Sequence, residues 1–155
     1  MRISTKGRYG LRAMVDLALH RGEGPVMMRA ITERQGIPRK YLHALLTPLR
    51  HADLVRSVRG SRGGYVLARD PSQITARQVV EALEGSLTLV DCREKGSLCK
   101  MHGSCATRRL WEDLGRLLDD HLAQVSLAEL ANGKPLVTKK AKNQARRIES
   151  PAKGK

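Results

Sequence analysis

Three cysteines are the residues of this sequence with the clearest chemical potential. Cys92, Cys99 and Cys105 are its only cysteines, and they fall within 14 consecutive positions with the spacing C-x6-C-x5-C. Disulfides would leave one of the three thiols over, and structural zinc sites favour tight C-x2–4-C pairs, which this sequence lacks. Soft thiolates on a loop instead suit an iron–sulfur cluster, of the 2Fe-2S or the 4Fe-4S type.

The three cysteines do not by themselves complete the ligand set of such a cluster. His102, inside the same loop, is a candidate fourth ligand, and an exogenous water or a small thiol would also complete the site. Two alternatives stay open, a metal-free thiol sensor and a zinc site. Nearby cations would lower the thiol pKa values and favour the reactive thiolates; they are Arg93, Lys95, Lys100 and Arg108.

A second stretch, residues 36–67, combines a basic helix with a basic hairpin: GIPRKYLHALLTPLRHADLVRSVRGSRGGYVL. Pro38 suits the first turn of the predicted helix, where a missing N–H costs nothing. Pro48 lies inside the helix at a cost of roughly 3 kcal/mol, and it predicts a bend or a tightened last turn. The apolar stripe has spacing i, i+3, i+4 and i+7 and consists of Leu42, Leu45, Leu46 and Leu49.

The hairpin follows directly after this helix. Residues 55–59 alternate in strand fashion, and Tyr65, Val66 and Leu67 make the predicted return strand, with the tip RGSRGG between them. The glycines of the tip permit left-handed dihedral angles and close backbone approach. A helix with a basic polar face followed by a basic hairpin is typical of a winged helix, a fold that binds DNA.

The candidate DNA contacts divide between the helix and the hairpin tip. In helix-turn-helix proteins the first turns of the second helix enter the major groove, and phosphate contacts hold the protein in register. Arginines at a hairpin tip can enter a narrow minor groove. The candidates are Arg39, Lys40, Tyr41 and His43 for the groove, Arg50 for phosphate, and Arg59 or Arg62 at the tip.

Two shorter helices are needed to position the basic helix. Apolar spacing predicts the first over residues 8–20 and the second over residues 27–35. The turn at residues 35–38 then completes a helix-turn-helix arrangement. Residues 1–70 are therefore predicted to form a winged-helix DNA-binding head.

The segment after the head is predicted to connect it to the cysteine loop. Thr75 is a good N-cap for a helix over Ala76–Leu83, and residues 87–90 are a short strand or extended stretch. Residues 71–91 are thus a connecting helix and strand. Residues 92–105 are the cysteine loop and candidate cluster site.

A long amphipathic helix is predicted over residues 107–125, and Ser126 starts a last short helix. A helix of about 19 residues is nearly 30 Å long, so the small head cannot cover its whole apolar stripe. A second copy of the chain is the simplest cover, which makes residues 106–132 a dimerisation unit. Residues 133–155 are predicted to be a basic disordered tail. The stripe comprises Leu110, Trp111, Leu114, Leu117, Leu118, His121, Leu122 and Val125.

Charge is sorted along the chain. The net charge is +14, and residues 1–69 carry 14 Lys and Arg against four Asp and Glu. Residues 70–133 are mildly acidic and residues 134–155 are basic again, which indicates a polyanion bound at one end. No run of about 18 apolar residues could span a membrane, and no signal peptide is recognisable, so we expect a cytoplasmic protein.

Several of these segments together resemble the Rrf2 family of bacterial transcriptional regulators. The resemblance covers about residues 1–131 and is carried by MRISTKGRY, RQGIPRKYL, SVRGSRGGYVLARD, the cysteine loop and RRLWEDL. It implies a homodimer of winged-helix heads, crossed through the long C-terminal helix, that binds palindromic promoter DNA. It also implies DNA contacts at positions matching Lys40, Tyr41, Arg50 and Arg59, and cluster ligands at the three cysteines.

Two positions depart from the type member of that family. An acidic residue that discriminates between promoters is replaced by His43, so the promoter preference does not carry over. The histidine that serves there as fourth cluster ligand, three residues after the last cysteine, is replaced by Arg108.

The expected fold class is mostly α with a small β-hairpin, a winged helix-turn-helix domain plus a long C-terminal dimerisation helix. The expected function is that of a DNA-binding transcriptional regulator, a repressor acting as a homodimer, whose DNA affinity depends on an iron–sulfur cluster or on the redox state of Cys92, Cys99 and Cys105. The alternative is a cluster-free regulator of the same fold, controlled by thiol oxidation or by a partner protein. An enzyme is not expected, because the sequence offers no phosphate loop, no Ser/His/Asp arrangement and no paired carboxylates in an apolar pocket.

Overall fold

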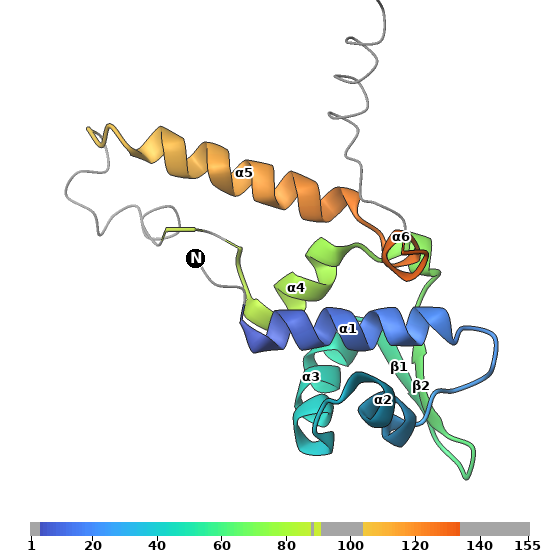
Figure 1. Cartoon of the computed structure of the whole chain (residues 1–155). Coiled ribbons are helices and arrows are strands. Elements are labelled where there is room, and N and C mark those ends of the chain that lie inside the picture. The colour runs from blue at the N-terminus through green and yellow to red at the C-terminus, as the bar shows by residue number, and fades with distance from the viewer. Residues whose placement is uncertain (1–3, 88, 91–103, 134–155) are drawn as a thin grey trace, which may run out of the picture.

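The protein is mostly helical, with one two-stranded antiparallel hairpin (Figure 1). The structure, a computed structural model, describes residues 4–87, 89–90 and 104–133. Its elements in chain order are α1 (Thr5–Leu19), α2 (Met28–Gln35), α3 (Arg39–His51), β1 (Val55–Val58), β2 (Gly64–Leu67), the 3-10 turn η1 (Pro71–Gln73), α4 (Ala76–Glu84), α5 (Arg108–Gln124) and α6 (Leu127–Ala131).

The helix-turn-helix arrangement forms as predicted, with small differences at the helix ends. α1 begins earlier than its apolar spacing suggested, because the Ser4 hydroxyl accepts a hydrogen bond from the Lys6 N–H at 3.0 Å and caps the helix. α2 ends at Gly36, whose φ of 62° is left-handed and suits glycine. Pro38 occupies the N-cap of α3 rather than its first turn.

α3 continues past its internal proline as an α-helix to His51, so the predicted tightened last turn does not form. Pro48 has no N–H, which leaves the carbonyl of Ala44 without its helical partner. Ala44 is exposed, so water can bond to that carbonyl. The leucine stripe predicted for this helix is buried along its whole length.

The hairpin is short and regular, and a third segment extends it. The β1–β2 pairing runs from Val55 opposite Leu67 to Val58 opposite Gly64. Val26 makes two backbone hydrogen bonds with Tyr65, at 2.8 and 2.9 Å. The hairpin is therefore tied to the segment that precedes α2.

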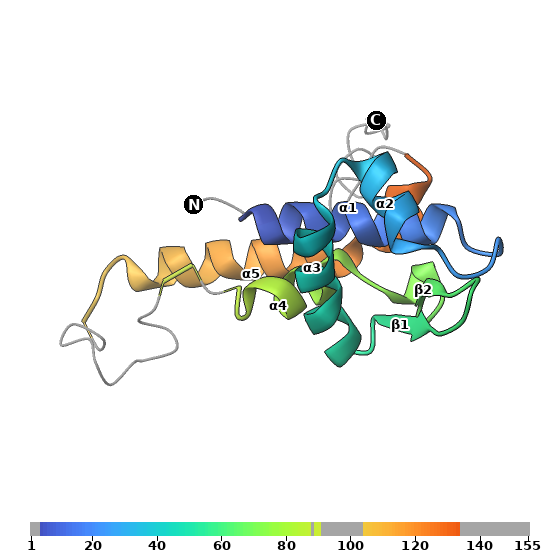
Figure 2. The same ribbon diagram turned by 90° about the horizontal axis from the view of Figure 1, so that it is seen from below.

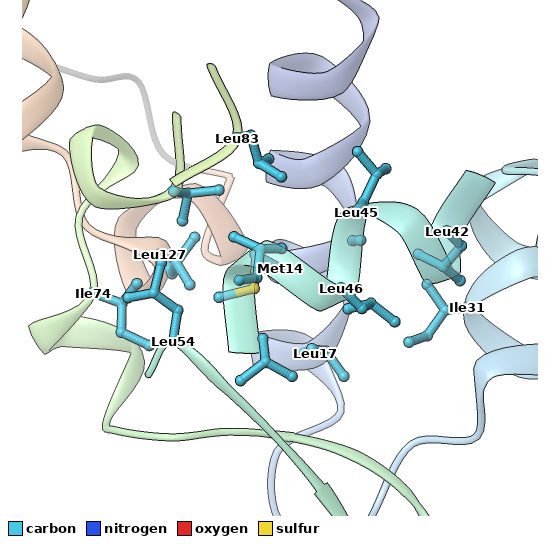
Figure 3. Close-up of a cluster of buried hydrophobic side chains, with 14 of the residues drawn as sticks. Met14, Leu17, Ile31, Leu42, Leu45, Leu46, Leu54, Ile74, Leu83 and Leu127 are labelled. Carbon is cyan, nitrogen blue, oxygen red and sulfur yellow. The ribbon is translucent and has the colours of Figure 1, made fainter. Parts of the chain in front are cut away.

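One hydrophobic core, which lies around α1, joins the head to the later helices (Figure 3). Met14 and Leu46 pack in the same cluster as Leu83 of α4 and Leu127 of α6. The core therefore extends beyond residue 70, where the head was expected to end. The residues labelled in Figure 3 are Met14, Leu17, Ile31, Leu42, Leu45, Leu46, Leu54, Ile74, Leu83 and Leu127.

The C-terminal end of α5 is fastened to the start of α4. The Ala76 N–H donates to the Val125 carbonyl at 2.8 Å, and Arg77 forms an ion pair with Asp119 at 2.6 Å. α4 has the predicted Thr75 cap, and the Thr75 N–H donates in return to the Gln78 side-chain oxygen at 3.1 Å. The strand considered for residues 87–90 is not formed at residues 87, 89 and 90.

α5 is close to its predicted length, and its N-terminal half extends away from the other elements (Figure 1). At 17 residues it is about 26 Å long. Val125, at its end, is buried, whereas the exposed fractions are 60% for Leu110, 39% for Trp111, 43% for Leu114 and 55% for Leu117. Within the described ranges, no helix has both the length and the apolar character needed to cross a bilayer.

Among the described residues, Asp16 of α1 is the one charged side chain that is buried, with 1% exposed. Its carboxylate accepts two bonds from the Arg34 guanidinium, at 2.9 and 2.7 Å, and one from the Gln35 amide at 3.0 Å. Burial alone would raise the pKa of Asp16, but these bonds and the Arg34 charge outweigh it and lower the pKa below its ordinary value of 3.8.

Asp16→Asn is expected to lower the free energy of unfolding at pH 7 by about 2 kcal/mol, the contribution of hydrogen bonds to a charged group. The lowered pKa means that this contribution is complete above the unfolded-state pKa near 3.8 and is lost as the pH falls through the folded-state value. Urea unfolding at pH 7 and at pH 3 measures the difference. The exposed carboxylate Glu33 supplies the control, and Glu33→Gln should change little at either pH. An equal effect of Asp16→Asn at both pH values would contradict the prediction.

Candidate nucleic-acid interface and thiol site

α3 and the tip of the β1–β2 hairpin lie on the same side of the molecule, opposite α5 (Figure 1). Figure 2, seen from below, shows α3 and the hairpin next to each other on this side. We call the exposed residues of α3 and of the hairpin tip the basic face. Because the buried leucines of α3 point into the core, its polar side is left on this face.

The structure places the predicted contact residues of α3 as their spacing suggested. Arg39, Lys40 and His43 are exposed in the first turns, and Arg50 is exposed in the last turn. Tyr41 is half-buried, and its ring packs edge-to-face against another aromatic ring of the same chain. The helix therefore offers cations at both ends and a partly covered aromatic between them.

The hairpin tip presents Arg59 and Arg62, both exposed. The turn closes through a bond from the Gly63 N–H to the Gly60 carbonyl at 2.9 Å, and Gly60 has a φ of 119°. A Cβ at Gly63 would lie 2.4 Å from the Val58 carbonyl oxygen. Glycine is therefore required for the conformation at one position of the tip and for close packing at the other.

Within the described residues, the cations of the basic face make no ion pair with a carboxylate; they are Arg39, Lys40, Arg50, Arg59 and Arg62. Other arginines do pair, for example Arg29 with Glu33 at 2.7 Å. Positive side chains without internal partners create a field that attracts a polyanion, and nucleic-acid phosphates are the commonest one.

An open groove of about 460 Å³ separates the start of α3 from the hairpin. Besides Arg39 and Gly64, it is lined by Met27, Arg29 and Ser57, which were not among the predicted contact residues. Ser57 could have been recognised as an outward-facing residue in the alternation of β1. Met27 and Arg29 offered no local signal, because only the fold brings the start of α2 beside the hairpin.

Gly64→Ala is expected to destabilise the hairpin, because the new Cβ would lie 2.4 Å from the Val26 carbonyl oxygen, a backbone atom that cannot easily move. Overpacking of this kind costs about 1–3 kcal/mol. Urea unfolding measures the loss, and Ser61→Ala at the exposed tip is the control, expected to change stability by less than about 0.5 kcal/mol. Equal stability of the two variants would show that the Val26–Tyr65 pairing can relax.

Of the proposed cluster ligands, Cys105 is described, while Cys92, Cys99 and His102 lie outside the described residues, as does the basic tail at residues 134–155. Cys105 is a free, partly exposed thiol just before α5. Its sulfur lies 3.4 Å from the Thr107 hydroxyl, and this bond, the Thr107 backbone N–H and the nearby Arg108 lower the pKa of the thiol despite some desolvation. A thiol held toward its thiolate form is suited to ligate a metal.

The C-terminal end of α4 is held by groups at the start of α1. The Glu84 carboxylate, at the end of α4, accepts hydrogen bonds from the Ser4 hydroxyl and from the Gly7 N–H, the latter at 2.9 Å. A Cβ at Gly10 would lie 2.0 Å from a methyl group of Leu83, so α1 and α4 are in close contact there. The last residues of α4 are thus fastened to the first turns of α1.

Comparison with known proteins identifies the family of this chain. The sequence profile of the Rrf2 family, described as "Iron-dependent Transcriptional regulator", matches residues 3–133. The HTH-type transcriptional regulator IscR of Sodalis glossinidius is 42% identical over 137 residues, which are 88% of this chain and 82% of that protein. IscR of Serratia proteamaculans is 42% identical over 149 residues, 95% of this chain and 90% of that protein.

Solved structures agree with the sequence relatives. CymR, titled the global cysteine regulator of B. subtilis, has a TM-score of 0.74 at 38% identity and covers 86% of this chain and 98% of its own. IscR of T. potens has a TM-score of 0.71 at 36% identity, with coverage of 99% and 94%. These neighbours confirm the predicted mostly helical winged-helix fold, whereas the dimerisation role of the long C-terminal helix stays a prediction. The relatives are named as transcriptional regulators, which confirms the prediction that the protein is not an enzyme. The chain therefore belongs to the Rrf2 family and is a DNA-binding transcriptional regulator.

Proposed function

We propose that the basic face is the DNA-binding surface, with α3 in the major groove and the hairpin tip in the adjacent minor groove. The observation that carries this proposal is the set of cations on α3 and the tip, exposed on one side of the molecule without internal carboxylate partners in the described part of the chain. Arg39, Lys40, Tyr41 and His43 would meet base edges, Arg50 would meet phosphate, and Arg59 or Arg62 would enter the minor groove.

The regulator acts as a homodimer on palindromic promoter sites. The support for this is α5, whose apolar stripe stays exposed where it extends past the core, most of all at Leu110 and Leu117. A two-fold pairing of α5 helices would cover that stripe and set two copies of α3 about one turn of DNA apart. A dimer bound across a promoter blocks access to it, so we propose repression as its action in the cytoplasm.

Cys92, Cys99 and Cys105, with His102 as the candidate fourth ligand, would hold an iron–sulfur cluster, and loading of this site would change the DNA affinity. The donor chemistry fits, because Cys105 is free, accessible and shifted toward its thiolate. When bound, such a cluster supplies redox-sensitive iron. The names of the IscR relatives and the iron-dependent description of the family agree with this assignment.

A second candidate is a cluster-free regulator controlled by thiol oxidation or by a partner protein. The observation that favours it is the similarity to CymR, titled a global cysteine regulator, which is as close in structure as the IscR neighbour. In either case a change at the cysteine loop would reach α1 through Glu84, which accepts bonds from Ser4 and Gly7.

Binding to DNA is tested with a palindromic duplex selected from a random pool by the unsubstituted protein. Arg59→Ala is expected to weaken binding to this duplex at least roughly tenfold, because the exposed guanidinium is lost from the hairpin tip. Titration by fluorescence anisotropy at physiological salt measures the affinity.

The control is Arg116→Ala, which removes the same charge from α5, on the side away from the basic face. It should leave the affinity nearly unchanged. Unchanged binding by Arg59→Ala would show that the hairpin does not contact DNA. Equal losses of affinity in Arg59→Ala and Arg116→Ala would show that Arg59 contributes only through the net charge of the protein.

A further inference from the structure

Arg12 of α1 holds the end of α2 at the start of the turn that leads to α3. Its Nε donates to the Gln35 side-chain oxygen at 3.3 Å, and its Nη2 donates to the Gln35 backbone carbonyl. The last carbonyls of a helix have no partner inside the helix, so this bond caps α2. The next residue, Gly36, is left-handed and begins the turn.

The Gln35 side chain is itself fixed in orientation from its other side. Its amide Nε2 donates to the buried Asp16 carboxylate at 3.0 Å, which leaves the amide oxygen facing Arg12. Arg34 makes two further bonds to the same carboxylate. Gln35 is therefore bonded both to Arg12 and to the buried Asp16 carboxylate. Both of these residues belong to α1.

The same guanidinium is also linked to α3 through a pair of aromatic rings, Tyr9 and Tyr41. The Cζ of Arg12 lies 5.4 Å from the centroid of the Tyr9 ring, within the range of a cation–π contact. The Tyr9 ring meets the Tyr41 ring edge-to-face, with centroids 5.9 Å apart and planes at 84°. Tyr41 lies in the first turns of α3, among the residues proposed to meet base edges.

We infer that Arg12 is a positioning residue for α3: it fixes both the turn before this helix and the aromatic pair that contacts its first turns. The start of α3 needs such support, because its N-cap, Pro38, makes no side-chain capping bond. The inference deepens the proposed function and rests on it. Base contacts require side chains placed within a fraction of an ångström, whereas phosphate contacts tolerate small shifts. Loss of Arg12 should therefore impair sequence discrimination more than general affinity for DNA.

The test compares two duplexes of equal length and composition, the selected palindrome and a scrambled version of it. With full-length Arg12→Met, the ratio of the two affinities should fall about tenfold, the discrimination of one well-made base contact. The affinity for the scrambled duplex should be unchanged. Arg8→Met, one turn earlier on α1 and equally exposed, removes the same charge and should keep the ratio.

A second pair of variants isolates the aromatic contact. Within the described residues, the Tyr9 hydroxyl makes no hydrogen bond, and the ring alone contacts Tyr41. Tyr9→Phe should therefore keep the affinity ratio, while Tyr9→Leu should lower it. Thermal unfolding confirms that each variant is folded at the assay temperature. If the Tyr9 and Tyr41 rings only stabilise the fold, Tyr9→Leu would lower the unfolding temperature and leave the ratio of the two DNA affinities unchanged.

The inference is overturned if Arg12→Met weakens binding to both duplexes by the same factor, since that result marks a direct phosphate contact, or if it leaves both unchanged. Lys40→Ala separates this failure from failure of the proposed function. A palindrome affinity that depends on Lys40 but not on Arg12 would refute only the positioning role. An affinity that depends on neither residue would refute the assignment of α3 as the reading helix.

Discussion

Replacing Leu114 and Leu117 together with glutamate is expected to convert the proposed dimer into a monomer and to abolish measurable binding to the palindromic duplex. These side chains are 43% and 55% exposed on α5, next to Leu110 and Trp111, which are exposed as well. Contiguous apolar surface of this kind marks an interaction site. In a two-fold pairing of α5 helices, the double variant would place four carboxylates in one apolar interface, where charges lose their hydration.

The double variant at Leu114 and Leu117 should lower the DNA affinity more than the loss of any single DNA-contacting side chain. A dimer binds its second half-site at a high effective concentration, and a monomer loses this gain, which is worth about 10²–10⁴ in affinity. Light scattering after size-exclusion chromatography measures the mass, and anisotropy titration measures the affinity. The double variant Ala123→Glu, Gln124→Glu adds the same two charges to α5 at exposed positions off the stripe and should remain dimeric. A stripe variant that stays dimeric would refute the role of α5.

Cys105→Ser is expected to abolish iron binding, since a serine hydroxyl remains protonated where the thiol is shifted toward its thiolate. Unsubstituted protein purified without oxygen should be coloured and should contain iron and acid-labile sulfide. The variant should be colourless and iron-free. Metal analysis and visible absorption spectra measure both, and Ser104→Ala, at the neighbouring exposed position, should behave like the unsubstituted protein.

The outcome for the unsubstituted protein decides between the two proposed modes of control. A colourless, iron-free anaerobic preparation would refute the cluster. The alternative would then be tested by comparing DNA affinity after thiol oxidation with that after reduction, and by searching for a partner protein. Neither result would alter the proposed role of the basic face, because that face consists of residues of α3 and of the hairpin tip and includes no cysteine.

The elements that form the basic face could largely be predicted from local sequence. The leucine spacing of α3, the helix stop at Gly36, the cap at Thr75 and the alternation around the RGSRGG tip all depend on residues within about four positions of one another. Such patterns are decided by the periods of helix and strand. The starts of α1 and α3 differ from those predicted, because the N-cap positions of Ser4 and Pro38 depend on backbone geometry as well as on residue type.

The sequence by itself determined the winged-helix order, the clustering of cations in residues 1–69 and the presence of three neighbouring thiols. Only the tertiary structure decided which distant residues hold the helices in place. Asp16 accepts a hydrogen bond from Gln35, 19 positions away, and Glu84 accepts one from Ser4, 80 positions away. The local periods of helix and strand predict neither contact. The structure likewise placed α6 in the core of the head and left half of α5 uncovered. Contacts at such separations depend on how whole elements pack, and packing is set by the complete core rather than by any one segment.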